Sequence, residues 1–208
     1  MTSKIKNIKD TEETQDNSDA AILDFETEFS YELKIPKDRI AVLIGKSGDI
    51  KKQIEVETHT SININSKDGD VTISGEDALG LYAAREVIRA ISRGFNPEYA
   101  RLLLKPDYSF EVFNIAEFSG KNKNAIARLK GRVIGKEGKA RKIIEELTEV
   151  NICVYGKTVA IIGEIENVGI ARRAIQSLLT GAPHSNVYTW LEHRRKELKM
   201  KSMLPQEI

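Results

Sequence analysis

The chain contains 208 residues, of which 40% are hydrophobic and 30% are charged, and this composition is typical of a globular protein with one or two domains. Its net charge is only +1, but residues 1–28 hold three lysines against eight carboxylates and so carry −5. The rest of the chain therefore carries +6, which indicates a basic body behind an acidic N-terminal tail.

Several classes of protein are excluded by simple features. No apolar run reaches the roughly 18–20 residues of a membrane-spanning helix, and we expect no secretory signal because the N-terminus lacks an apolar segment. Cys153 is the only cysteine, so an intramolecular disulfide is impossible, and residues 151–155 predict a buried strand with a plain core cysteine. We therefore expect a protein of the reducing cytoplasm without a metal or other cofactor.

Residues 1–24 are polar and acidic and predict a disordered tail. From Phe25 onward the pattern predicts a strand that stops at Pro36, two helices separated by glycines, a hairpin with its turn at 67–69, and a long helix. We expect strand 29–35, helices 37–44 and 49–56, strands 61–65 and 70–74, and helix 76–92. The apolar face expected for the long helix consists of Leu79, Ala83, Val87, Ile88 and Ile91.

The same order of elements recurs after a short helical connector at 96–106. We expect strand 109–115, helices 124–134 and 139–147, strands 151–155 and 158–162, and helix 165–179. The phrase Ile44-Gly45-Lys46-Ser47-Gly48 matches Ile134-Gly135-Lys136-Glu137-Gly138 at an offset of 90 residues. Two tandem copies of one fold are therefore predicted.

A further helix is expected after Pro183, up to about residue 201. Its apolar side includes Trp190 and Leu191, which we expect to pack onto the second copy. Its other side is basic and includes Arg194 and Arg195, which suits either an acidic partner or plain solvation.

Both copies resemble type I KH domains, in which a GxxG loop joins the first two helices and binds about four nucleotides of single-stranded nucleic acid. The resemblance implies an α+β fold of two tandem KH domains with the order β-α-α-β-β-α. Each would be a three-stranded antiparallel sheet covered by three helices, with a C-terminal helix after the second. We place the KH domains at 25–95 and 109–182, the linker helix at 96–108, and the C-terminal helix and tail at 183–208.

The GxxG loop offers a physical reason for nucleic-acid binding. A glycine lacks the Cβ atom that would collide with a closely approaching phosphodiester backbone. The loop also begins the next helix, so we expect unpaired N–H groups and the positive end of the helix dipole to face phosphates. Lys46 and Lys136 add positive charge at the same place.

Basic residues gather around the second loop, where nine of them between positions 120 and 142 stand against Glu137 alone. They are Lys121, Lys123, Arg128, Lys130, Arg132, Lys136, Lys139, Arg141 and Lys142. The first copy is weaker, with Lys34, Lys37, Arg39, Lys46, Lys51 and Lys52 against Asp38 and Asp49. We expect nucleic acid rather than a merely solvated face, and more of the salt-dependent affinity from the second copy.

Beside each loop the resemblance implies an apolar groove that holds bases by contact and by hydrogen bonds to their edges. Its candidate floor is Ile44, Ile54, Ile62 and Ile64 in the first copy and Ile134, Ile143, Ile152 and Val154 in the second, although each of these also suits the core. The predicted RNA-binding residues are Ile44, Gly45, Lys46, Ser47, Gly48, Lys51, Lys52, Ile62, Ile64, Lys130, Arg132, Ile134, Gly135, Lys136, Glu137, Gly138, Lys139, Arg141, Lys142, Ile152 and Val154.

Enzymatic motifs are not found in the sequence. Gly45-Lys46-Ser47 resembles the end of a nucleotide-binding P-loop, but the glycine that this motif requires five residues earlier is Ile40. The histidines His59, His184 and His193 lack metal-ligand spacing. We therefore expect a binding protein and not an enzyme.

The segments 128–138 (RLKGRVIGKEG) and 182–188 (APHSNVY) resemble the archaeal branch of the ribosome-assembly KH proteins related to eukaryotic Krr and partner-of-Nob factors, within a similarity that covers residues 28–200. The resemblance implies binding to the 3′ region of small-subunit (16S) rRNA during subunit maturation. The implied protein partners are the Nob-type endonuclease and the alpha subunit of translation initiation factor two. Two alternatives stay open: a KH adaptor of other specificity, as in RNA degradation, and a protein-interaction scaffold that does not bind RNA.

Overall fold

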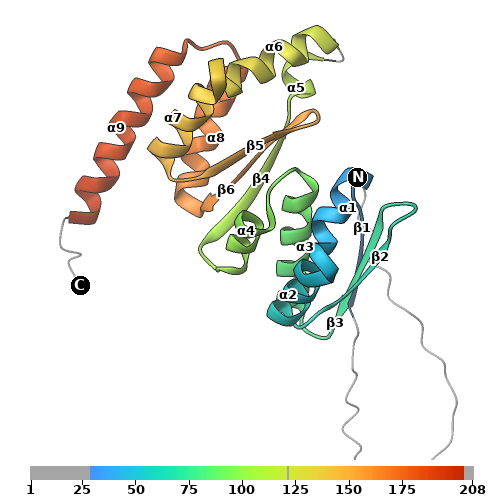
Figure 1. Cartoon of the computed structure of the whole chain (residues 1–208). Helices are drawn as coiled ribbons and strands as arrows, with labels where there is room; N and C mark the ends of the chain where they lie inside the picture. Colours follow the sequence, from blue (N-terminus) through green and yellow to red (C-terminus); the bar gives the residue numbers. More distant parts are fainter. Residues whose placement is uncertain (1–28, 121, 204–208) are drawn as a thin grey trace, which may run out of the picture. The chain divides into compact units, whose positions relative to one another are not determined.

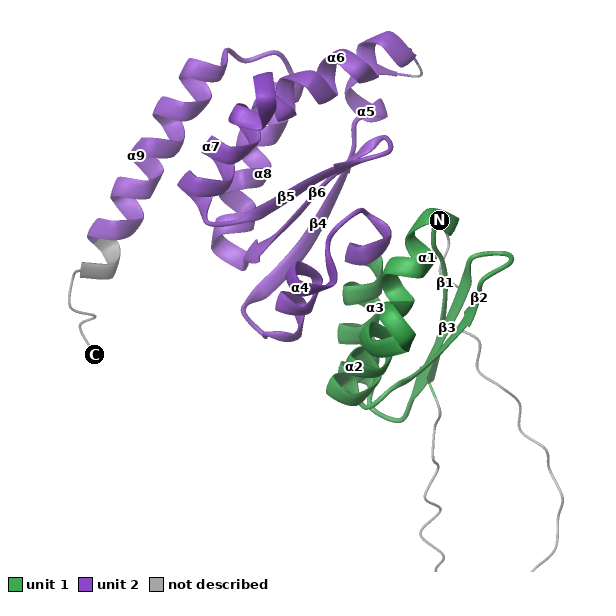
Figure 2. Ribbon diagram, viewed as in Figure 1, with its two compact units in different colours: residues 1–89 green, residues 90–208 purple. Residues whose placement is uncertain are grey.

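The computed structural model describes residues 29–120 and 122–203. The chain divides into two compact units, Met1–Arg89 and Ala90–Ile208 (Figures 1 and 2). Each unit contains one three-stranded antiparallel sheet with helices packed on it, which confirms the α+β fold and the tandem repeat. The tail predicted at 1–24, Lys121 and the last five residues lie outside the described residues.

The first unit has the expected order of elements. They are β1 Phe29–Lys34, α1 Lys37–Ile44, the 3-10 turn η1 Lys46–Gly48, α2 Asp49–Thr58, β2 Ser61–Asn65, β3 Asp70–Gly75 and α3 Ala78–Ser92, which ends beyond the unit boundary. The strand order is β1-β3-β2, so β2 lies at an edge of the sheet. Its core includes Leu43, Ile54, Ile62, Val71 and Ile73, all at most 1% exposed.

The apolar face predicted for α3 is wrong at Leu79, which is 80% exposed. The side chain of Asp77 caps this helix by accepting hydrogen bonds from the N–H groups of Leu79 and Gly80, at 3.0 and 2.9 Å. A Cβ built on Gly80 would lie 2.2 Å from the carbonyl oxygen of Thr58, so the Gly80 side of the helix packs against the end of α2. Leu79, one position earlier, consequently faces solvent, and Leu81 is buried in its place.

The second unit repeats this plan with additions at both ends (Figure 2). Its elements are α4 Pro97–Ala100, η2 Arg101–Leu104, β4 Tyr108–Asn114, α5 Ala116–Ser119, α6 Lys123–Ile134, η3 Lys136–Gly138, α7 Lys139–Thr148, β5 Asn151–Tyr155, β6 Thr158–Glu164, α8 Ile165–Leu179 and α9 His184–Met203. The strand order is β4-β6-β5, so β5 is the edge strand that corresponds to β2. The short helix α5 is absent from the sequence-based expectation.

Gly94 and Phe95, just before the predicted connector, pack on the second sheet and partly cover Cys153. The rings of Phe95 and Phe110 meet edge to face with centroids 6.3 Å apart. A Cβ on Gly94 would lie 2.8 Å from the sulfur of Cys153, so this segment lies directly against β5. Cys153 is half-buried there, on the face opposite Ile152, and the expectation of a core cysteine is corrected accordingly.

The helix α9 packs against the second copy through Val187 and Leu191, which are 4% and 1% exposed. Trp190 is half-buried, with the guanidinium of Arg173 5.2 Å from the centre of its ring. Burial raises the pKa of the Tyr188 phenol above its ordinary value. Within residues 29–120 and 122–203, we find no helix with the length and apolar character that crossing a membrane requires.

Candidate nucleic-acid interface

The two GxxG loops follow the same backbone path. The φ angles are 74° at Gly45 and 73° at Gly135, and 84° at Gly48 and 77° at Gly138. Between the glycines, Ser47 and Glu137 also have positive φ, at 57° and 56°. Such angles favour glycine, and their recurrence shows that both copies build one defined turn between their first two long helices.

The two glycines of each loop serve different purposes. A Cβ on the first glycine would collide with the following helix, at 2.4 Å from Cγ1 of Ile50 for Gly45 and 2.6 Å from Cβ of Ala140 for Gly135. A Cβ on Gly48 or Gly138 would meet no heavy atom of the described structure within 4 Å. The first glycine is therefore needed for internal packing, and only the second leaves open main chain for an approaching ligand.

We expected unpaired N–H groups of the loop to face phosphates, and the structure shows that some of these groups are already paired inside the loop. The N–H of Gly48 donates to the carbonyl of Gly45 at 3.5 Å, and that of Gly138 to Gly135 at 3.3 Å. The first N–H of each following helix, at Asp49 and Lys139, donates to the carbonyl of Lys46 and Lys136 respectively. The exposed lysines 46 and 136 consequently provide much of the attraction for an anion.

The predicted apolar floor separates into core and groove residues. The side chains of Ile54, Ile62 and Ile152 are 0%, 1% and 4% exposed, so they belong to the core. Ile54 lies on the buried stripe of α2 with Thr58, and Ile62 and Ile152 are the buried positions of their strands. The half-buried residues that remain for a groove are Ile44, Ile64, Ile134, Ile143 and Val154.

The edge strands contribute main-chain groups to this groove. The N–H of Ile62 donates to Oε1 of Glu55 at 2.8 Å, and the N–H of Ile152 donates to Oε1 of Glu145 at the same distance. These N–H groups therefore point away from the neighbouring strand. Because the main-chain groups of residues two apart in an antiparallel strand point to the same edge, Ile64 and Val154 also turn their N–H and C=O groups to the open edge. These groups have the donor and acceptor character that base edges require.

Glu55 and Glu145 are site-adjacent residues that sequence reasoning missed. Each also pairs with a predicted RNA-binding residue one turn earlier: Glu55 Oε1 lies 3.6 Å from Nζ of Lys51, and Glu145 Oε2 lies 3.4 Å from Nε of Arg141. The repeat offset of 90 residues aligns Lys51 with Arg141 and Glu55 with Glu145. This repeated pairing is the feature of the sequence from which the two glutamates could have been identified.

The predicted basic residues have different surroundings. Lys46, Lys52, Lys136, Lys139 and Lys142 are exposed, whereas Lys51, Lys130, Arg132 and Arg141 are half-buried. Arg132 is used for packing: its Nε and Nη2 donate to the carbonyls of Leu178 and Ala182, at 3.0 and 2.6 Å. The exposed lysines thus form the part of the predicted set that can reach phosphates without breaking a contact seen in the fold.

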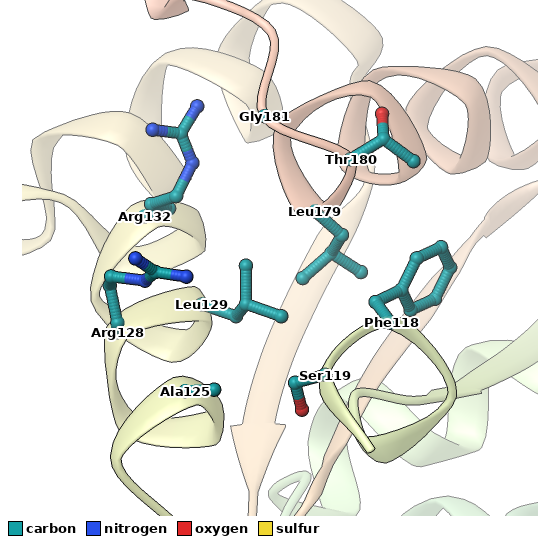
Figure 3. A pocket seen from close by; sticks show the side chains of 9 residues that line it. All are labelled: Phe118, Ser119, Ala125, Arg128, Leu129, Arg132, Leu179, Thr180 and Gly181. Carbon is teal, nitrogen blue, oxygen red and sulfur yellow. The ribbon is translucent and has the colours of Figure 1, made fainter. Parts of the chain in front are cut away.

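A pocket of about 590 Å³ is lined by residues of α5, α6 and the end of α8, and the sequence did not predict it. Figure 3 shows Phe118 and Ser119 of α5 facing Arg128 and Leu129 of α6, with Leu179 to Gly181 at the end of α8 closing the hollow. Its lining combines apolar side chains, such as Leu129 and Leu179, with polar ones that include the exposed Arg128. Among residues 29–120 and 122–203 we find no cluster of three histidine, cysteine or carboxylate side chains suited to a metal ion.

Comparison with known proteins matches both copies to the same fold family. Residues 109–196 match the family described as eukaryotic type KH-domain (KH-domain type I), and residues 30–90 match the KH domain family. A KH domain-containing protein of Methanocaldococcus jannaschii is 52% identical over 171 residues, which cover 80% of this chain and 74% of the relative. The RNA-binding protein pno1 of Dictyostelium discoideum is 30% identical over 203 residues, covering 89% of this chain and 84% of the relative.

Two solved structures from Pyrococcus horikoshii are similar to most of the chain. The crystal structure of Dim2p has a TM-score of 0.74 at 46% identity and covers 79% of this chain and 99% of its own. A complex described as a/eIF2alpha, aDim2p and rRNA contains a chain with a TM-score of 0.77 at 45% identity, covering 84% of this chain and 97% of its own.

Proposed function

Since this chain belongs to the tandem KH-domain family of PNO1 and archaeal Dim2p, we propose that it binds single-stranded RNA through its two GxxG loops and assists the maturation of the small ribosomal subunit. The RNA that we propose is the 3′ region of 16S rRNA. The protein would act in the cytoplasm and without catalysing a reaction, by holding and shielding that RNA segment.

One observation carries the RNA-binding proposal. At Gly48 and Gly138 the main chain is open to solvent on the side where a Cβ would stand, and an exposed lysine lies two residues before each. A nucleotide backbone can therefore rest against the main chain while lysine neutralises a phosphate. The edge strand beside each loop supplies outward N–H and C=O groups for the bases.

The similar complex supports the choice of partners. That structure contains rRNA and a/eIF2alpha together with Dim2p, so we propose rRNA and the alpha subunit of translation initiation factor two as partners of this chain. A Nob-type endonuclease would then act on the RNA that this protein holds. The family resemblance supports this last partner.

The experiment is a fluorescence anisotropy titration with labelled single-stranded RNAs that tile the 16S rRNA. We expect the oligomers from the 3′ end to bind most tightly. The double variant Lys136→Asp with Gly138→Asp should lose most of this affinity while keeping its thermal unfolding cooperative, because both residues lie outside the core. Weak and equal binding to every oligomer would contradict the rRNA assignment.

A second measurement separates the RNA role from a protein scaffold. Purified alpha subunit is titrated against the wild-type chain and against the double variant. If the variant binds the alpha subunit normally and RNA poorly, the two surfaces are distinct. If the wild-type chain binds the alpha subunit and no RNA at all, the scaffold alternative is the correct one.

A further inference from the structure

Three large apolar side chains at one end of the first unit are exposed. Leu79 and Tyr82 in α3 are 80% and 55% exposed, and Phe29 at the start of β1 is 44% exposed. Leu79 and Tyr82 are three residues apart, so they lie on the same side of the helix. Single exposed apolar residues are common, but a contiguous cluster marks a surface that another segment or molecule covers. We call these three residues the α3 patch.

The position of Phe29 joins it to the two residues of α3. Gly75, just before α3, pairs with Phe29, and Arg85, further along the helix, lies 5.2 Å from the centre of the Tyr31 ring. The helix α3 therefore runs beside β1 and in the same direction. Phe29 and Tyr31 are two residues apart and point to the same face of the sheet. Phe29 consequently lies next to Tyr82, which is one helical turn before Arg85.

The second copy has small or polar residues at the three equivalent positions. Gly94 and Gly181, which follow the two long helices with φ of 101° and 107°, align α3 with α8 at an offset of 87 residues. The strand pairing likewise aligns Phe29 with Ser109, since each pairs with the last glycine before the long helix. Phe29, Leu79 and Tyr82 thus correspond to Ser109, Glu166 and Gly169. The fold does not require apolar side chains at these positions, so their presence in the first copy points to an additional contact.

The chain before the first strand of each copy leads to the start of the long helix. In the second copy the N–H of Ile165, the first residue of α8, donates to the carbonyl of Asp107, just before β4, at 3.0 Å. The equivalent segment of the first copy ends at Phe29, and its residues 20–25 are AAILDF. Four extended residues span up to about 14 Å, which exceeds two helical turns. The apolar residues of this segment can therefore reach the α3 patch.

We propose that residues 20–28 lie along the start of α3 and cover the α3 patch with Ile22, Leu23 and Phe25. The folded first unit then begins near residue 20 and not at 25. Residues 10–19, which hold five of the eight carboxylates of the tail, are thereby attached at this end of the first unit.

The first experiment makes the covering segment polar in the full chain. The triple variant Ile22→Ser, Leu23→Ser and Phe25→Ser keeps the net charge and changes no residue of the described fold. We expect its binding of the apolar dye ANS to rise severalfold over the wild type, because the α3 patch becomes accessible. Amide hydrogen exchange in residues 81–86 should become roughly tenfold faster, because the start of α3 then opens more easily.

The second experiment removes the α3 patch and keeps the covering segment. Leu79→Ser with Tyr82→Ser should accelerate hydrogen exchange in residues 20–28. Added to the triple variant, these two substitutions should return ANS binding to the wild-type level. Ile165→Ser is the matched control, because Ile165 is 60% exposed at the start of α8 without an apolar cluster at the equivalent positions. It should change neither ANS binding nor exchange in residues 20–28.

ANS binding and hydrogen exchange in the triple variant equal to those of the wild type would overturn the inference. Unchanged exchange of residues 20–28 in the Leu79 and Tyr82 double variant would overturn it as well. Protection of the α3 patch that increases with protein concentration, in the wild type and the triple variant alike, would assign the patch to a second copy of the chain instead. None of these measurements involves RNA, so the proposed function stands or falls separately.

Discussion

Arg132 of α6 and His184 at the start of α9 join these two helices. Nε2 of His184 lies 2.8 Å from the carbonyl oxygen of Arg132, 52 residues away in sequence. The guanidinium of Arg132 in turn donates to the carbonyls of Leu178 and Ala182. These carbonyls lie at and just beyond the end of α8, where helix carbonyls lack partners within the helix. One side chain therefore caps α8 and fixes the start of α9 beside α6.

This arrangement predicts that Arg132 matters for stability more than for RNA. Arg132→Lys keeps the charge and loses the planar fork, so we expect the free energy of unfolding to fall by about 1–3 kcal/mol. Urea denaturation measures this loss. The slope of log Kd against log salt concentration for RNA binding should stay as in the wild type, because no phosphate contact is removed.

The exposed Lys139 is the control for Arg132. Lys139→Ala should leave the unfolding curve unchanged and reduce the salt slope by about 0.7, the value for one phosphate contact with a single strand. If Arg132→Lys instead preserved stability and reduced the slope, Arg132 would be an RNA ligand, as the sequence alone suggested.

The fold was largely predictable from the sequence because the pattern occurs twice. Periodicity alone placed α1 at Lys37–Ile44, β2 at Ser61–Asn65 and α8 at Ile165–Leu179 with the bounds that the structure has. The repeated GxxG phrase then identified both loops. Each copy supported the assignment of the other, and this is information that a single domain does not offer.

The roles of individual side chains were less predictable, since they depend on contacts distant in sequence. Leu79 has helical spacing with the core, yet the approach of Gly80 to Thr58 turns it to solvent. Arg132 belongs to a basic run, yet its partners are Leu178 and Ala182. The side chain of Ile62 is buried while its N–H points to the open edge of the sheet, and the residue type alone does not predict this difference.

The two glycines of the second loop should differ in how much they contribute to stability and to RNA affinity. Gly135→Ala should lower the free energy of unfolding by about 2–4 kcal/mol, because it adds strain at positive φ and a Cβ that would lie 2.6 Å from Cβ of Ala140. Gly138→Ala adds the strain alone and should cost about 1 kcal/mol. Thermal and urea unfolding compare the two variants.

For the folded fraction of each variant, we expect RNA affinity to fall more in Gly138→Ala than in Gly135→Ala, the reverse of the order of their losses in stability. Gly138→Asn tolerates positive φ better than alanine and so keeps more stability, but its side chain occupies the open space at the loop. We expect it to bind RNA more weakly than the wild type. Full affinity in Gly138→Asn would show that no ligand approaches the second glycine closely.

The pairing of Glu145 with Arg141 predicts a gain in electrostatic affinity. Glu145→Gln retains a side-chain oxygen that can accept the N–H of Ile152, and it removes the charge 3.4 Å from Nε of Arg141. Because such ion pairs contribute about 0–1 kcal/mol, stability should change little. RNA binding should become tighter and its salt slope steeper by about 0.7, since Arg141 is then available to a phosphate.

Glu145→Ala is the comparison for Glu145→Gln. It removes the acceptor of the Ile152 N–H as well and should destabilise the second unit by about 1 kcal/mol. If Glu145→Gln weakened RNA binding at every salt concentration, the carboxylate itself would be the group that contacts the RNA.

The unequal basic surroundings of the two loops predict an unequal division of RNA affinity. Lys46 with Lys52 and Lys136 with Lys139 are two pairs of exposed lysines at equivalent loops. The helix before the second loop carries Lys123, Arg128 and Lys130 and no carboxylate, whereas the helix before the first loop carries two basic residues beside Asp38. A five-nucleotide RNA is long enough for one loop, so it should bind the second copy, and Lys136→Ala with Lys139→Ala should lower its salt slope by about 1.4. Lys46→Ala with Lys52→Ala should not affect the binding of this short RNA.

An RNA long enough for both loops has a raised effective concentration at the first loop once the second is bound, so both pairs of substitutions should weaken its binding. Equal effects of the two pairs on the short RNA would mean that the added charge on α6 does not direct binding.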